Sequence, residues 1–123
     1  MITIYDEQDA RLITDPELAV LVQWHLIIAK ENGLEDLTCI AVIEPDDSEQ
    51  TVIDELGFSP LQNVLTETRF GDPDFIPAWD WLEVHHGWYE LIFTVGDGGF
   101  AYIVFLNRKH RTFADIIPRL AKC

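Results

Sequence analysis

The residues best suited to chemistry lie close together in one short segment, residues 79–88, which has the sequence WDWLEVHHGW. This segment holds three of the four tryptophans and two of the four histidines. Carboxylate and imidazole groups at such close spacing are the types that bind metal ions or transfer protons. The candidate binding residues are Trp79, Trp81, His85, His86 and Trp88.

The metal hypothesis depends on how this segment folds, and the sequence leaves two folds open. If residues 77–86 form a helix, Glu83 and His86 lie three residues apart on one face, which is half of the carboxylate–histidine arrangement of di-iron bundles. If they form a strand, Glu83 and His85 share a face and that argument does not apply. A metal site needs three or four ligands, and the other two histidines have no carboxylate at a matching spacing. We therefore expect no metal ion and no cofactor.

The sequence shows no convincing catalytic arrangement. The two serines, Ser48 and Ser59, fall at a predicted helix cap and in a predicted turn, outside any nucleophile elbow. Cys39 lies in a predicted apolar strand, where burial raises the pKa of a thiol and makes it inert. With 22 acidic residues some carboxylates pair by chance, so an enzyme using paired carboxylates has no support here. We predict no catalytic residues and favour a protein that is not an enzyme.

Composition excludes several classes of protein. The 123 residues include 22 acidic and 8 basic side chains, which gives a formal charge of −14, yet 48% of them are hydrophobic. So much apolar surface is atypical of disordered chains, and so much negative charge is unfavourable for binding nucleic acid directly. No apolar run approaches the roughly 18 residues of a membrane span, and two cysteines make no disulfide framework. We expect one domain, residues 1–123, located in the cytoplasm.

The elements that position these residues follow from periodicity and capping signals. Strands are predicted at residues 1–5, 38–43, 88–95 and 100–106, and helices at residues 16–32, 46–56 and 113–121. Residues 6–14 are expected to be a polar entry, and a further strand between residues 61 and 70 stays open. The fold class is α+β: one mixed, largely antiparallel sheet of four or five strands with three or four helices, including a C-terminal β-hairpin followed by a helix.

Two of these elements are unusually apolar. The strand at residues 100–106 is apolar on both faces, which predicts a central position in a sheet covered on both sides. The helix at residues 16–32 is apolar around most of its circumference, apart from a strip formed by Gln23 and Lys30. Such a helix must be covered on more than one side, so we expect it to be central or part of a homo-oligomer interface. We interpret His25, in its apolar arc, as a satisfied core or interface group.

Four stretches resemble one group of known proteins. They are HHGWYELIF at residues 85–93, GDGGF at residues 96–100, FGDP at residues 70–73 and WDW at residues 79–81. Over about residues 70–106 the chain resembles small acidic proteins of unknown function encoded on proteobacterial conjugative plasmids and integrative elements. The resemblance implies a bacterial, plasmid-borne accessory protein and gives no residue a role.

These observations predict a non-enzymatic interaction protein or accessory factor of a mobile element, with a protein partner or a second copy, as a homodimer. A DNA-mimic inhibitor is a special case, in which carboxylates imitate phosphates on a basic DNA-binding surface. The alternative is a small-molecule or metal-binding domain with a pocket near His85, His86 and the tryptophan cluster.

Overall fold

The computed structural model describes residues 1–57, 78–95 and 100–110. In these residues five strands form one open, mixed sheet in the order β1-β2-β5-β4-β3. The strands are β1 (Ile2–Ile4), β2 (Thr38–Ile43), β3 (Ala78–Val84), β4 (Trp88–Val95) and β5 (Phe100–Asn107). The helices are α1 (Glu7–Ala10), α2 (Pro16–Glu31), α3 (Glu49–Leu56) and the short 3-10 helix η1 (Glu35–Leu37). The predicted α+β class is therefore confirmed, whereas the predictions for residues 61–70 and 113–121 lie outside the described residues.

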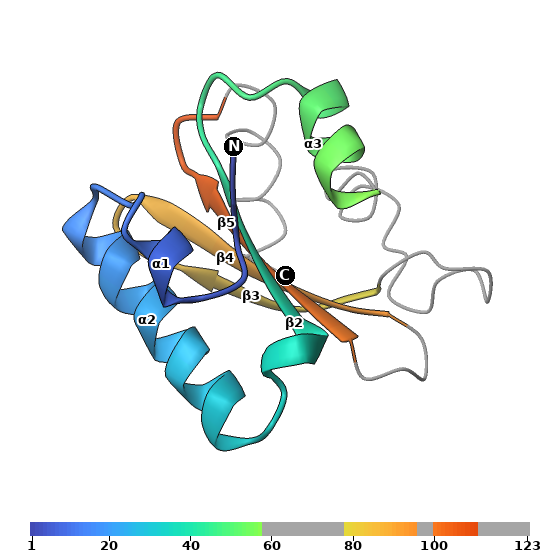
Figure 1. Cartoon of the computed structure of the whole chain (residues 1–123). Coiled ribbons are helices and arrows are strands. Elements are labelled where there is room, and N and C mark those ends of the chain that lie inside the picture. Colours follow the sequence, from blue (N-terminus) through green and yellow to red (C-terminus); the bar gives the residue numbers. More distant parts are fainter. Residues whose placement is uncertain (58–77, 96–99, 111–123) are drawn as a thin grey trace.

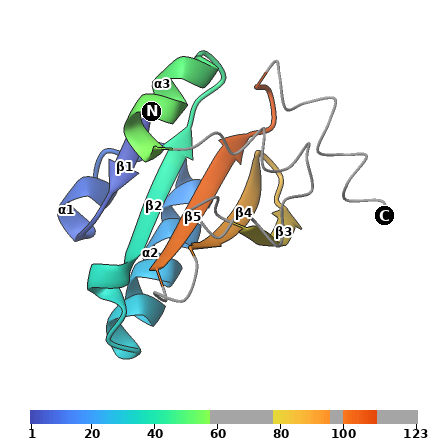
Figure 2. The same ribbon diagram turned by 90° about the vertical axis from the view of Figure 1, so that its right-hand side faces the viewer.

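The sheet is antiparallel except at its centre, where β2 and β5 run parallel. β5 is the middle strand, as its two apolar faces predicted. One face packs against α2 through a cluster that includes Leu18, Val22 and Phe105, and the other packs against α3 through Val52 and Leu56. Figure 1 and Figure 2 show the two helices on opposite sides of the sheet. β4 turns Trp88, Glu90 and Ile92 toward the α2 side of the sheet.

The ends of the two longer helices follow the capping residues. The side chain of Asp15 accepts hydrogen bonds from the backbone of the first turn of α2, and Ser48 does the same for α3. α3 ends at Gly57, which has a φ of 84°. The expectation of a polar entry over residues 6–14 was wrong in part, because Asp6 caps the four-residue helix α1. A helix of one turn has too few residues for its apolar periodicity to be detected.

α2 covers one face of the sheet and does not lie at the centre of the fold. Its buried residues are Leu18, Val22, His25 and Ala29. On the outer side, Val20, Trp24 and Ile27 are 69%, 57% and 51% exposed. Of the two alternatives expected for this helix, the central position was therefore wrong, since the described chain provides a single layer against α2. The homo-oligomer interface stays a prediction. Among the described helices, none is both long enough and apolar enough to cross a bilayer.

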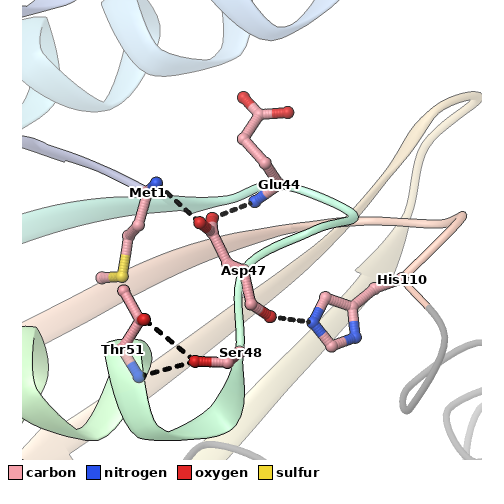
Figure 3. A network of polar contacts seen from close by, with 6 residues as sticks. All are labelled: Met1, Glu44, Asp47, Ser48, Thr51 and His110. Carbon is pink, nitrogen blue, oxygen red and sulfur yellow. Dashed lines mark hydrogen bonds and ion pairs between the residues drawn. The ribbon is translucent and has the colours of Figure 1, made fainter.

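A polar network fixes the segment between β2 and α3 (Figure 3). The carboxylate of Asp47 pairs with the N-terminal ammonium of Met1 at 2.9 Å and accepts a hydrogen bond from the Glu44 amide at 2.7 Å. The imidazole Nε2 of His110 lies 2.9 Å from the Asp47 carbonyl oxygen. Residues next to β1, β2 and β5 are thereby joined at one end of the sheet. Burial and the neighbouring Asp47 raise the pKa of Glu44 above its usual value.

Candidate functional site

Residues 79–88, which hold the candidate binding residues, lie in a β-hairpin formed by β3 and β4. β3 ends at Val84, and the amide of His85 donates to the carbonyl of Trp88 at 2.8 Å, which closes the turn before β4. The alternative of a helix over residues 77–86 was therefore wrong. The register sets Glu83 directly opposite Glu90. Two carboxylates from different strands thus share one position on the sheet.

Glu90 is the centre of a buried polar cluster between the sheet and α2. Its Oε1 atom lies 3.0 Å from Nε2 of His25 and 3.4 Å from Nε2 of His85. The side chains of His25 and Glu90 are almost fully buried. Because the carboxylate oxygen accepts, His25 donates the N–H of this hydrogen bond. The interpretation of His25 as a satisfied core group is confirmed.

His85 differs from His25 in one respect. Its Nε2 atom is buried and has no hydrogen-bond partner, although Glu90 is nearby. A buried polar atom without a partner costs free energy, so such atoms are uncommon and are often found at ligand sites. Glu83, His85 and Glu90 offer ligand atoms that all lie within 4.8 Å of one another.

The hairpin turn is attached to α2 and to the end of β5. The backbone N–H of Gly87 donates to Glu17 at 3.1 Å, and the indole N–H of Trp88 donates to Asp15 at 3.3 Å. The guanidinium of Arg108 donates to the carbonyl oxygens of His85 and His86 at 3.1 Å each. These bonds hold the turn in place independently of the imidazole rings. The position of His85 is therefore set by its backbone.

The helix N-terminus also sets the charge of Asp15. Hydrogen bonds from the backbone, chiefly that of Leu18, and the bond from Trp88 hold the pKa of this carboxyl below its usual value. Asp15 is therefore a carboxylate at neutral pH. Its negative charge interacts favourably with the positive N-terminal end of the α2 dipole, and its hydrogen bond holds the Trp88 indole beside the turn.

A pocket of about 550 Å³ opens beside the cluster, between α2 and the hairpin. Its walls combine the polar cluster with apolar side chains of α2 and β4. The lining residues are Leu21, Trp24, His25, Ile28, Glu83, His85, Glu90 and Ile92. A concave apolar site with a few converging polar groups is the usual form of a small-ligand site.

The predicted binding residues divide into three groups. His85 lines the pocket, whereas His86 is exposed on the turn and does not line it. Trp88 is buried in the core beneath α2. Trp79 and Trp81 belong to β3, but their side chains lie outside the described part of the structure. Of the three predicted residues whose side chains the structure describes, His85 lines the pocket and His86 and Trp88 do not.

The residues that join His85 there were missed as site residues. Glu90 is the partner of Glu83 in the register, and His25 reaches the site from α2. The pairing of Glu83 with Glu90 could have been predicted from the sequence, because a two-residue turn at His86 and Gly87 sets residue 83 opposite residue 90. His25 needed the packing of α2 on the sheet, which the sequence alone does not provide.

A second surface lies on the outer side of α2. Val20, Trp24 and Ile27 follow one another at intervals of four and three residues, so they form a continuous line along the helix. We call these three residues the outer stripe. Trp24 also lines the pocket and contacts the ring of His25 edge-on at 5.0 Å between ring centroids. The pocket and the outer stripe are therefore adjacent.

No family model, curated protein or solved structure matches this chain.

Proposed function

We propose that this protein is a non-enzymatic interaction protein that forms a homodimer through the outer stripe of α2. The observation that carries the proposal is the exposure of three large apolar side chains in one line. Single exposed apolar residues are ordinary, but a contiguous apolar row on a helix is typical of a surface that binds another protein. The resemblance to plasmid-encoded proteins supports a role as an accessory factor of a mobile element.

A second copy is the occupant that suits this surface best. In a two-fold dimer each patch meets itself, so an apolar row pairs with an apolar row without any other partner. The outer stripe spans about 10 Å along the helix axis, and Trp24 lies near its middle. An antiparallel α2–α2 contact therefore places Trp24 against its counterpart and Val20 against Ile27 of the partner subunit. Tryptophan at the centre of an interface is a common source of binding energy.

Charge gives this dimer a characteristic salt dependence. Each copy carries a formal charge of −14, so two copies repel each other over long range. Added salt screens that repulsion and leaves the apolar contact intact. We therefore expect the homodimer to become tighter with salt. A complex with a basic partner, including one bound by DNA mimicry, becomes weaker instead.

Acidic side chains of the described residues also serve the fold itself. Asp6, Asp15 and Asp47 all accept hydrogen bonds from backbone amides of their own chain. Asp6 and Asp15 cap helices and Asp47 also pairs with the N-terminal ammonium, so these carboxylates are already occupied and less suited to imitate a row of phosphates. The apolar surface is therefore the basis of the proposal, and mimicry is not.

The test is the mass of the particle in solution. Sedimentation velocity of the wild-type chain should give twice the mass of one chain, and the variant carrying Val20→Lys and Ile27→Lys should give a single chain. Lysines at both ends of the outer stripe remove the two apolar contacts that flank Trp24, which weakens such a dimer by at least about tenfold.

The matched control is Leu12→Lys, which adds charge at another exposed apolar residue, 63% exposed and outside the outer stripe. This variant should remain dimeric. A wild-type particle with the mass of one chain at every concentration would contradict the proposal. Equal dissociation by Leu12→Lys would also contradict it, because the outer stripe would then have no special role.

A further inference from the structure

The hairpin brings two glutamates together at a cost. Glu83 and Glu90 are direct partners in the antiparallel register, where like charges are destabilising. Glu90 is also buried, and a buried carboxylate needs a compensating group. His25 supplies one hydrogen bond to it. A cation between the two strands would compensate both carboxylates at once.

The distance between His85 and Glu90 fits metal coordination. In a tetrahedral site with bonds of 2.0–2.1 Å, neighbouring ligand atoms are about 3.3 Å apart. The 3.4 Å between Nε2 of His85 and Oε1 of Glu90 is close to this separation, and these two atoms form no hydrogen bond. The nitrogen of His85, which forms no hydrogen bond, is therefore placed as a ligand atom next to another ligand atom.

We propose that Glu83, His85 and Glu90 bind one divalent transition-metal ion of the Zn²⁺ class. One imidazole and two carboxylates favour ions such as Zn²⁺ over Mg²⁺ and Ca²⁺, which take oxygen ligands. His25 is not one of the three ligands. It donates a hydrogen bond to Glu90 and so fixes the orientation of that carboxylate.

The surrounding structure suits such a site. Arg108 and Glu17 hold the turn that carries His85, so little rearrangement is needed on binding. Glu83 is exposed, which gives an ion a route from solvent. Three protein ligands leave a coordination position for water or an exogenous donor, and the three residues line the 550 Å³ pocket. The three ligand residues are not part of the outer stripe. A negative result for the metal site would therefore leave the homodimer proposal unaffected, and the reverse also holds.

The experiment is calorimetric titration of the metal-stripped full chain with Zn²⁺, and with Mg²⁺ as a comparison. We expect one Zn²⁺ per chain and no binding of Mg²⁺. His85→Ala and Glu83→Gln each remove a ligand and should weaken Zn²⁺ binding by about 100-fold or more. His25→Asn removes the group that orients Glu90 and should weaken it by about 10–100-fold.

The matched control is His86→Ala, which removes the neighbouring, exposed imidazole of the same turn. This variant should bind Zn²⁺ like the wild type. Thermal unfolding provides a second readout, because an ion that binds only the folded state raises Tm in wild type and His86→Ala but not in His85→Ala. Absence of Zn²⁺ binding to the wild type would overturn the proposal. Equal losses in His85→Ala and His86→Ala would overturn it as well.

Discussion

Asp15 has two roles, as the N-cap of α2 and as the acceptor of the Trp88 indole. Because its pKa in the folded state lies below the unfolded value of about 3.9, it stabilises the fold fully above that value. This contribution is lost as the pH falls through the folded-state pKa. Asn also caps helices but does not titrate, so Asp15→Asn separates the hydrogen bonding of this side chain from its charge.

We expect Asp15→Ala to lower the free energy of unfolding at pH 7 by about 1 kcal/mol, and Asp15→Asn to lower it less. Between pH 7 and pH 3 (roughly the range that spans this titration), the wild type should lose more stability than Asp15→Asn. Urea unfolding at both pH values measures these differences. A parallel decline of wild type and Asp15→Asn would show that Asp15 does not titrate below its unfolded pKa.

Cys39 should be inert while the chain is folded. It lies buried in β2, and burial raises the pKa of its thiol, so little thiolate forms at neutral pH. In a Cys123→Ser background, we expect a thiol reagent to modify Cys39 at least about 100-fold more slowly than in guanidinium, because reaction requires local opening. Rapid labelling of the folded chain would contradict the burial of this strand.

The candidate site shows which residue properties a sequence reveals. His85 was identified from residue type and local spacing. Its carboxylate neighbours follow from one turn, but the choice between helix and strand for residues 77–86 had to be made first, and Glu83 is compatible with both. His25 lies 65 residues before Glu90, so only the docking of α2 on the sheet brings them together. Long-range packing of this kind leaves no local signal in the sequence.

Among the elements, those with strong end signals were predicted best. Two strands, β2 at residues 38–43 and β4 at residues 88–95, have the predicted bounds, since turn residues and β-branched runs define them. α2 begins at Pro16 as predicted and ends at Glu31, one residue before the expected end. β3 stayed open because tryptophan, leucine and valine between acidic residues satisfy either periodicity over so few positions.

The end of α3 provides a test of one such signal. Gly57 has a φ of 84°, a conformation that residues with a Cβ atom adopt at a cost of about 1–2 kcal/mol. We expect Gly57→Ala to lower the free energy of unfolding by about 1 kcal/mol, measured by urea denaturation. Nothing lies within 4 Å of the added methyl group, so the loss comes from the backbone alone.

Gly87→Ala is the matched control for this substitution. Gly87 also has open space around its Cα, but its φ is not positive. Its replacement should change stability by less than about 0.5 kcal/mol. If both variants lose the same stability, the left-handed backbone at the end of α3 is not the cause.

Across the whole molecule, the pocket and the outer stripe meet at Trp24. The prediction that α2 is either central or part of a homo-oligomer interface was based on an angular count of its apolar residues. The exposed apolar side of α2 excludes the central position, and the homo-oligomer interface stays a prediction. The mixed sheet and its central strand were also predicted. A strand that is apolar on both faces must be covered on both sides, and this is the position of a central strand. The strand order was not predicted, since nothing local specifies that β2 lies beside β5.

The parallel pair at the centre of the sheet joins segments made at very different times. Cys39 of β2 is paired with Tyr102 of β5, about 60 residues later in the chain. At about 5–20 residues per second, a ribosome needs several seconds to add that length. During this interval β2 and α2 have left the exit tunnel with their apolar faces uncovered. We therefore expect a product that terminates before β5 to expose these apolar faces and to be prone to aggregation.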